Sequence, residues 1–272
     1  MNILEKIIAR KKVEVELSKK VKTISDLEKE LLFSRSTASL SSVLRNTSTP
    51  RIISEFKRKS PSKGIINGGV LPEIVTADYV SEGAAALSVL TDIDFFGGSF
   101  DDFLKARKAN PQIPMLRKDF IVDEYQLFEA KAIGADIILL IAACLEPSEI
   151  VSLSKKAQDL GLEVLLEVHN AEELAQSLCD TIDIVGVNNR NLKTFETSIK
   201  TSIELSTQIP DNFVKISESG LSDAETIIEL FMHGYKGFLI GETFMKTANP
   251  GTALGMLQNN LSRIGNRNPH VL

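Results

Sequence analysis

The stretch IILLIAACLEPSEIVSLSKKAQDLGLEVLLEV, residues 137–168, carries the pattern that decides the fold. It opens with an apolar run at 137–141, continues with a helical pattern at 147–160, and closes with a second apolar run at 164–168. Gly161 stands where a helix ending at 160 needs a residue that tolerates left-handed backbone. A strand, a helix and a strand in this order predict two parallel strands joined by a right-handed crossover.

The same alternation repeats on both sides of this unit. Apolar, often β-branched runs that predict strands occur at 51–56, 84–90, 115–116, 137–141, 164–168, 182–187, 213–216 and 238–240. Helical patterns lie between them, among others at 124–133, 147–160, 171–178 and 223–232. Strand–helix units in this number, over roughly 220 residues, predict an α/β fold that is a single (β/α)8 TIM barrel. A doubly wound open sheet is the alternative, but the turn after the first strand, KRKSPSKG (57–64), is not glycine-rich.

The first fifty residues differ from the rest of the chain. Apolar residues between 3 and 15 recur at helical spacing, and a second short helix is expected at 25–33 with Ser25 as its N-cap. We therefore expect one domain over the 272 residues, with an N-terminal helical extension at 1–50 and the barrel at 51–272. The extension is expected to lie near the barrel mouth and to help enclose a substrate.

Composition narrows the function classes. Hydrophobic residues make up 43% and charged residues 25% of the chain, which fits a globular protein. The net charge of −5 disfavours nucleic acid as a partner, although a small anion needs only a few local cations. The apolar run at 137–145 is too short to cross a membrane, and the N-terminus lacks a signal-peptide core. Two cysteines make no disulfide framework, so a reduced, cytoplasmic location is expected.

Ionisable residues gather at the predicted strand ends, where barrel enzymes carry their active sites. Glu55 and Lys57 follow the first strand, Lys118 the third and Glu167 the fifth, which offers a general acid and a general base. Strand alternation puts Glu55 and Lys57 on one face. A lysine near another cation or an apolar wall would have a lowered pKa. Solvated charges and structural Lys–Glu pairs are the alternative interpretation.

Glycines and aromatic residues at further strand ends predict the rest of a binding site. Ser219–Gly220 and Gly241–Glu242 lie where barrels commonly bind phosphate, and Ser60 and Lys63 can close over the same anion. The alternative is two tight turns that simply need glycine. Phe95–Phe96 suggests an apolar wall for a flat ligand, or an aromatic anchor for its loop.

Several site motifs are absent from the sequence. Histidine occurs at 169, 233 and 270 only, and neither HExxH nor CxxC occurs, so no metal site is expected. The absence of GxGxxG and P-loop sequences argues against nicotinamide and ATP. His169 is interpreted as a hydrogen-bonded residue at a strand end.

Short motifs at the predicted strand ends follow one another in a distinctive order. They are ISEFKRKSPSKG (53–64), LSVLTD (87–92), FFGGS (95–99), LRKDFI (116–121), LEVH (166–169), GVNNRN (186–191), SESG (217–220) and LIGE (239–242). Together they resemble the indole-3-glycerol-phosphate synthase family of tryptophan biosynthesis. The resemblance covers nearly the whole chain and rests on several independent motifs.

The resemblance implies a carboxy-lyase that closes the indole ring of 1-(2-carboxyphenylamino)-1-deoxyribulose 5-phosphate with loss of carbon dioxide and water. No metal or organic cofactor is implied. Lys118 would be the general acid for ring closure, Glu167 the general base in dehydration, and Lys57 a proton donor there. Glu55 would orient the lysines and the substrate hydroxyls.

The resemblance also implies which residues hold the substrate. Asn188 and Arg190 would hold the reaction intermediate and the carboxylate of the substrate's aromatic ring. Asn188 would count among the catalytic residues. The remaining substrate-binding residues are the phosphate group Ser60, Ser219, Gly220, Gly241 and Glu242, the ring pocket Phe96, Phe120 and Leu139, and Glu218. The expected ligand is a small phosphorylated substrate, and the expected oligomeric state is a monomer. Association with other tryptophan-pathway enzymes is the alternative.

Two other functions remain open from the residues. One is a class I aldolase-like barrel in which Lys118 forms a Schiff base with a sugar phosphate. The other is a non-catalytic barrel that binds a phosphorylated metabolite as a regulatory or scaffold subunit, against which the acid and base residues argue.

Overall fold

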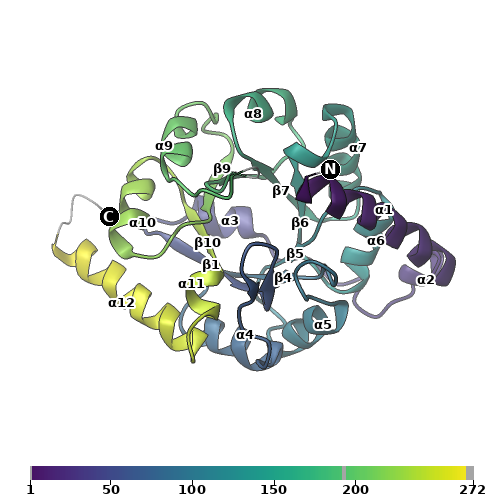
Figure 1. The fold of residues 1–272 in the computed structure, drawn as a ribbon, viewed down its shortest axis with the longest axis horizontal. Helices are drawn as coiled ribbons and strands as arrows, with labels where there is room; N and C mark the ends of the chain where they lie inside the picture. The colour runs from purple at the N-terminus through teal and green to yellow at the C-terminus, as the bar shows by residue number, and fades with distance from the viewer. Residues whose placement is uncertain (1, 192–193, 268–272) are drawn as a thin grey trace.

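A closed ring of parallel strands surrounded by helices forms the centre of the molecule (Figure 1). The computed structural model describes residues 2–191 and 194–267. In ring order the strands are β1 (Arg51–Phe56), β10 (Gly237–Ile240), β9 (Val214–Glu218), β8 (Ile184–Asn188), β7 (Glu163–Val168), β6 (Ile137–Ile141), β5 (Met115–Lys118) and β4 (Ala86–Leu90). Because β1 pairs with both β4 and β10, the sheet is the predicted (β/α)8 barrel and not an open sheet.

Helices surround the ring. They are α4 (Pro72–Ser81), α5 (Phe100–Ala109), α6 (Tyr125–Ala132), α7 (Pro147–Asp159), α8 (Ala171–Ser177), α9 (Lys200–Ser206), α10 (Ala224–Met232), α11 (Glu242–Met245) and α12 (Pro250–Arg267). Those from α4 to α10 connect its strands, and α11 and α12 follow the last strand. A short hairpin of β2 (Lys59–Ser60) and β3 (Gly64–Ile65) follows β1, and the 3-10 turn η1 (Ala142–Cys144) follows β6. Gly161 ends α7 with a φ of 72°, the left-handed conformation predicted there.

Alternation along each strand separates two apolar layers. In β7, Val164 and Leu166 pack outward against the helices, whereas Leu165 packs inside the ring. Residues of this inward parity fill the barrel with buried aliphatic side chains. They include Ile53, Leu116, Ile137, Leu139, Leu165, Ile184, Val214, Ile216 and Leu239. On β1, β5, β7 and β9 the next inward position toward the carboxyl end is charged, so these charges rest directly on an apolar floor.

The N-terminal extension contributes to both ends of the barrel. Helix α1 (Ile3–Val21) begins at the carboxyl ends of the strands and runs outward along α6 in Figure 1, whereas α3 (Leu40–Arg45) lies behind the centre. Leu40 and Leu44, one helical turn apart, join the apolar cluster inside the ring. The expectation that the whole extension lies near the mouth is therefore wrong for α3, because its apolar face plugs the opposite opening.

The second helix also begins elsewhere than expected. Helix α2 (Ile24–Leu27) starts after Thr23, whose side chain accepts a hydrogen bond from the backbone of Asp26 in a capping box. Ser25 is therefore inside the helix and is not its cap. Within the described ranges, no helix is both long and apolar enough to span a bilayer.

Candidate active site

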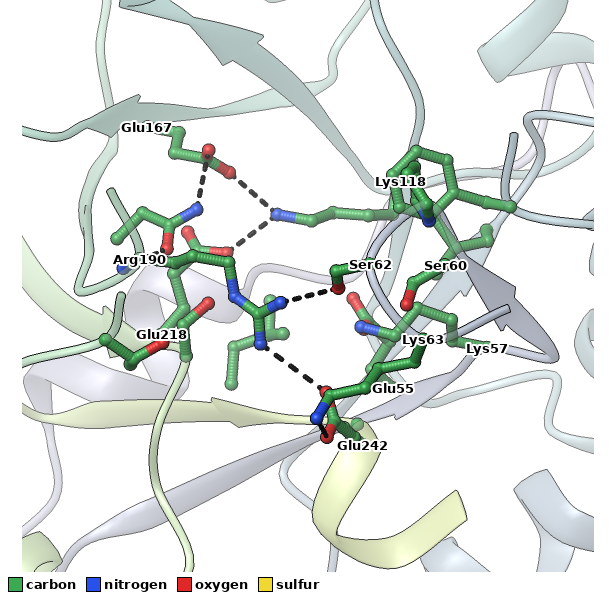
Figure 2. Close-up of a pocket in the computed structure, with 18 of the residues that line it drawn as sticks. Glu55, Lys57, Ser60, Ser62, Lys63, Lys118, Glu167, Arg190, Glu218 and Glu242 are labelled. Carbon is green, nitrogen blue, oxygen red and sulfur yellow. Dashed lines mark hydrogen bonds and ion pairs between the residues drawn. The ribbon is translucent and has the colours of Figure 1, made fainter. Parts of the chain in front are cut away.

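The carboxyl ends of the strands surround a cavity of about 640 Å³ (Figure 2). Phe95, suggested together with Phe96 as an apolar wall, is not among the residues that line this cavity. Every residue that the family resemblance placed in the site does line it. They are Glu55, Lys57, Ser60, Phe96, Lys118, Phe120, Leu139, Glu167, Asn188, Arg190, Glu218, Ser219, Gly220, Gly241 and Glu242. Ile3, Leu4 and Ile7 of α1 also line the cavity, so the extension contributes an apolar part of its boundary.

Four charged side chains form the top layer of the barrel interior. Glu55, Lys118, Glu167 and Glu218 come from β1, β5, β7 and β9, which are alternate strands around the ring. In a barrel of this kind, alternate strands contribute the side chains of one interior layer. The layering therefore brings three carboxylates and one ammonium together from segments distant in the sequence.

Lys118 is the centre of this layer. Its Nζ lies 2.9 Å from Glu167 Oε2 and 2.7 Å from Glu218 Oε2 (Figure 2). Asn188 donates from Nδ2 to the other oxygen of Glu167 at 3.0 Å, which fixes the plane of that carboxylate. Glu218 Oε1 is buried and lacks a hydrogen-bond partner among the described residues, so it remains available to a ligand.

The protonation states follow from this arrangement. Burial alone would lower the pKa of Lys118, but the charges of Glu167 and Glu218 raise it above its ordinary value. Burial alone would raise the pKa of Glu167, but Lys118 and other neighbours hold it below its usual range. Burial and the charge of Glu167 raise the pKa of Glu218 to about 7, against the effect of Lys118. The suggestion of a lowered lysine pKa is thus wrong for Lys118, because its neighbours are anions.

The second lysine of the site is paired separately. Lys57 Nζ lies 2.6 Å from Glu55 Oε1, and Ser88 donates to Glu55 Oε2 at 3.3 Å. Glu55 therefore holds Lys57 directly, as two residues on one strand face can. A Cβ at Gly241 would lie 2.5 Å from Glu55 Oε1, so only glycine leaves room for this carboxylate.

A further part of the cavity lining comes from the loop after β8, the β2–β3 hairpin and the start of α11. Arg190 donates to Ser62 Oγ at 2.9 Å and lies 3.4 Å from Glu242 Oε2, while Lys63 Nζ lies 3.8 Å from Glu242 Oε1 (Figure 2). Ser60 Oγ is buried without a hydrogen-bond partner in the described part of the chain. Two cations and a free hydroxyl here provide groups that an anion can use.

The turn after β9 is strained. Ser219 has a φ of 72°, a conformation that costs a non-glycine residue about 1–3 kcal/mol. The buried amide of Asn189 holds this turn, because Nδ2 donates to the Ser219 carbonyl oxygen at 3.1 Å and to Ser217 Oγ at 2.9 Å. The strained residue thus lies at a position that the sequence assigned to phosphate binding.

An aromatic wall closes another side of the cavity. The rings of Phe96 and Phe120 have centroids 5.8 Å apart and planes inclined by 38°. Leu139 of β6 lies in the apolar cluster below them and also lines the cavity. These side chains form a surface that suits a flat apolar group.

His169 is hydrogen-bonded at the end of β7, as predicted, and in addition contacts the proposed base Glu167. Its Nε2 lies 3.3 Å from Glu167 Oε1, and its Nδ1 lies 3.0 Å from Glu173 Oε2. Burial alone would lower its pKa, but these two carboxylates raise the pKa to about 10. His169 is thus an imidazolium that contacts the central layer. Its position two residues after Glu167 was the available signal, because side chains two apart share a strand face.

Metal ligands are not assembled in the described part of the chain. Within residues 2–191 and 194–267, no group of three or more histidine, cysteine, aspartate or glutamate side chains could hold a metal ion. His270 lies outside the described residues.

Acidic and basic side chains and an aromatic wall surround one cavity at the carboxyl ends of the strands. This arrangement is that of a TIM-barrel enzyme. A sequence model of the family described as "Indole-3-glycerol phosphate synthase" matches residues 4–257. An indole-3-glycerol phosphate synthase from Bacteroides thetaiotaomicron is 48% identical over 253 residues, covering 93% of this chain and 96% of the relative. One from Polynucleobacter asymbioticus is 42% identical, covering 94% and 98%. The chain belongs to the indole-3-glycerol phosphate synthase family.

Solved structures support the fold independently. The 3-hexulose-6-phosphate synthase of Salmonella typhimurium superposes with a TM-score of 0.63 at 13% identity, covering 78% of this chain and 99% of that one. A thiamine phosphate pyrophosphorylase from Pyrococcus furiosus gives a TM-score of 0.59 at 12% identity, covering 79% and 96%. At such identities the likeness concerns the barrel alone.

Proposed function

We propose that this chain converts 1-(2-carboxyphenylamino)-1-deoxyribulose 5-phosphate into indole-3-glycerol phosphate, as a carboxy-lyase. The observation that carries the proposal is Lys118, held 2.9 Å from Glu167 and 2.7 Å from Glu218 at the floor of the cavity. The protonated Lys118 can act as an acid, and the ionised Glu167 carboxylate beside it can act as a base.

Ring closure is the first step that these residues serve. The ring carbon bearing the carboxylate attacks the ketone carbon, and the ketone oxygen takes a proton from Lys118. The carboxylate then leaves as carbon dioxide, and its bonding electrons restore the aromatic ring. Arg190 and Lys57, which line the same cavity, balance the carboxylate charge until that point.

Dehydration is the second step. The new hydroxyl leaves as water with a proton from Lys57, and Glu167 removes a proton from the ring to complete the double bond. Asn188 orients Glu167 through its hydrogen bond at 3.0 Å, and Glu55 holds Lys57 at 2.6 Å. Glu218, which contacts Lys118 directly, holds the side chain of the lysine in place between the two steps.

The substrate's two ends would occupy opposite sides of the cavity. Its phosphate would lie against Ser60, Ser219, Gly220 and the backbone of Gly241 and Glu242. Its aromatic ring would lie against Phe96, Phe120 and Leu139. We also propose that the chain is one domain, with residues 1–50 as an extension of the barrel at 51–272, and that it works as a cytoplasmic monomer.

One assay tests the proposal. The purified chain is mixed with the carboxyphenylamino-deoxyribulose phosphate, and indole fluorescence is followed; absence of turnover would refute the proposed function. Lys118→Ala should lower turnover about 10²–10⁴-fold. Lys105→Gln, on the outer helix α5, is the matched control and should retain wild-type turnover. Borohydride added during turnover should leave Lys118 unmodified, whereas a reduced adduct there would indicate Schiff-base chemistry.

A further inference from the structure

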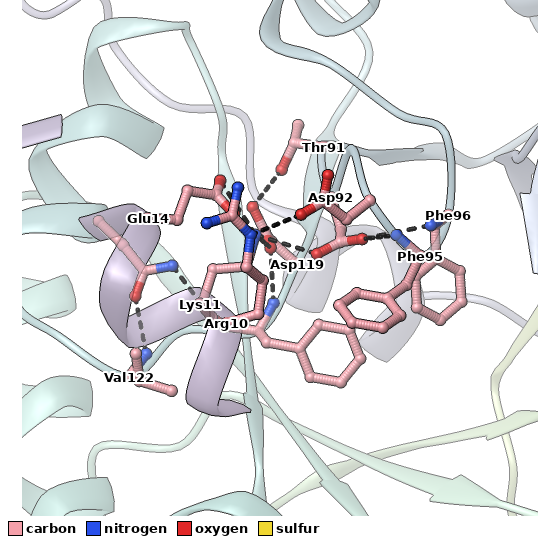
Figure 3. Close-up of polar contacts among 12 residues, drawn as sticks. Arg10, Lys11, Glu14, Thr91, Asp92, Phe95, Phe96, Asp119 and Val122 are labelled. Atoms are coloured by element: carbon pink, nitrogen blue, oxygen red, sulfur yellow. Dashed lines mark hydrogen bonds and ion pairs between the residues drawn. The ribbon is translucent and has the colours of Figure 1, made fainter. Parts of the chain in front are cut away.

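A buried lysine joins α1 to the barrel. The Lys11 side chain is 1% exposed, and its Nζ lies 3.1 Å from Asp92 Oδ2 and 2.9 Å from Asp119 Oδ1 (Figure 3). Glu14, on the same helix, lies 3.1 Å away on the more exposed side. Burying an ammonium group is costly unless it is paired, so the position of Lys11 depends on these carboxylates.

Both aspartates also hold the backbone of the aromatic wall. Asp92 Oδ1 accepts hydrogen bonds from the backbone N–H of Phe95 at 2.8 Å and of Phe96 at 3.2 Å (Figure 3). Asp119 Oδ1 accepts from the backbone N–H of Phe120 at 2.8 Å. Each carboxylate thus binds Lys11 and one of the two cavity-lining phenylalanines.

Other groups around this cluster also hold Asp119 and join the two loops. Asp119 Oδ2 lies 3.0 Å from Arg117 Nη2 and accepts a hydrogen bond from Thr91 Oγ1 at 2.6 Å. Arg10 pairs with Asp94 at the surface, where a salt bridge contributes little. Burial alone would lower the pKa of Lys11, but Asp119 and Asp92 raise it, so the ammonium stays charged at neutral pH.

We propose that Lys11 is a positioning residue that sets the aromatic wall of the cavity and thereby the recognition of the substrate's aromatic ring. The inference rests on the proposed function. Lys11 bridges the two carboxylates that hold the backbones of Phe96 and Phe120, and it adds to the Thr91–Asp119 hydrogen bond between the same loops. Ile7, one helical turn before Lys11, lines the same cavity. The packing of α1 on the barrel and the placement of the aromatic wall therefore depend on each other.

The test separates ring recognition from phosphate recognition. Two probes are titrated by calorimetry: the unreactive substrate analogue whose ketone is reduced to a hydroxyl, and ribitol 5-phosphate, which lacks the ring. Lys11→Met should weaken the analogue about tenfold and ribitol 5-phosphate less than about twofold. The KM for substrate should rise by a similar factor while kcat stays within about twofold. Lys12→Met, on the exposed side of α1, is the control and should bind both probes like wild type.

Unchanged binding of the analogue, or equal weakening of both probes, would overturn the inference. Thermal unfolding shows whether Lys11→Met is folded; if it is not, Lys11→Met with Asp92→Asn is measured in its place. The asparagine carbonyl still accepts from the Phe95 and Phe96 N–H groups, and no unpaired charge remains at that position. A wild-type chain without turnover refutes the proposed function, whereas an active wild type with an unaltered Lys11 variant refutes only the inference.

Discussion

Lys118 Nζ lies 2.9 Å from Glu167 Oε2, so the proposed acid and the proposed base pair with each other. The pair joins β5 to β7 across the top interior layer of the barrel. Each residue keeps the other in its charged form. Glu218, 2.7 Å from Lys118 Nζ, is the second carboxylate that holds the lysine.

Replacing Glu167 separates binding from chemistry. Glu167→Gln keeps the shape of the side chain and removes the base, so turnover should fall about 10²–10⁴-fold. Binding of the reduced analogue should change less than about threefold, because Arg190 and the aromatic wall are untouched. Calorimetry and the fluorescence assay measure the two quantities. Glu172→Gln, exposed on α8, is the control, and comparable loss of binding and turnover in Glu167→Gln would indicate a structural role.

His169 should make stability depend on pH. Its pKa is raised to about 10 from an ordinary 6.5, so the folded state favours the charged imidazole. The stabilisation is complete below pH 6.5 and is lost as pH rises through 10. His169→Gln should therefore lower the free energy of unfolding by about 2 kcal/mol at low pH. Urea titrations should show this difference shrinking toward pH 10. His233→Gln, on an exposed histidine, should show no such trend.

The plug helix α3 should contribute to stability and not to chemistry. Leu44 is fully buried in the cluster inside the ring, so Leu44→Ala should lower the free energy of unfolding by about 2–5 kcal/mol. Its KM should stay at the wild-type value, because α3 lies at the end of the barrel away from the cavity. Val43→Ala, 39% exposed on the same helix, should cost less than about 1 kcal/mol. Equal losses for the two variants in chemical denaturation would contradict the plug.

Truncations should distinguish the two roles of the extension. Removing residues 1–22 deletes α1 with Lys11 and Ile7, so the KM should rise at least about tenfold while the barrel stays folded. Removing residues 1–45 also deletes Leu40 and Leu44, so the melting temperature should fall as well. Steady-state kinetics and thermal unfolding measure both effects. A KM unchanged by the shorter deletion would contradict a contribution of α1 to the cavity.

The sequence alone determined the barrel and the membership of its cavity. Strand–helix alternation specifies parallel strands whose carboxyl ends converge, and the two-residue period fixes which side chains face inward. Residues as distant as Glu55 and Glu242 could therefore be assigned to one site, and both line the cavity. The resemblance to the family rested on the same strand-end motifs.

Tertiary structure alone decided which of these groups touch. Lys118 pairs with Glu167 and Glu218, and Lys57 pairs with Glu55, because layering in the ring sets distances that periodicity along the chain does not contain. The docking of Lys11 between Asp92 and Asp119, more than eighty residues away, depends on how α1 packs on the barrel. The pKa values follow these contacts, since burial and neighbouring charge act through space and not along the sequence.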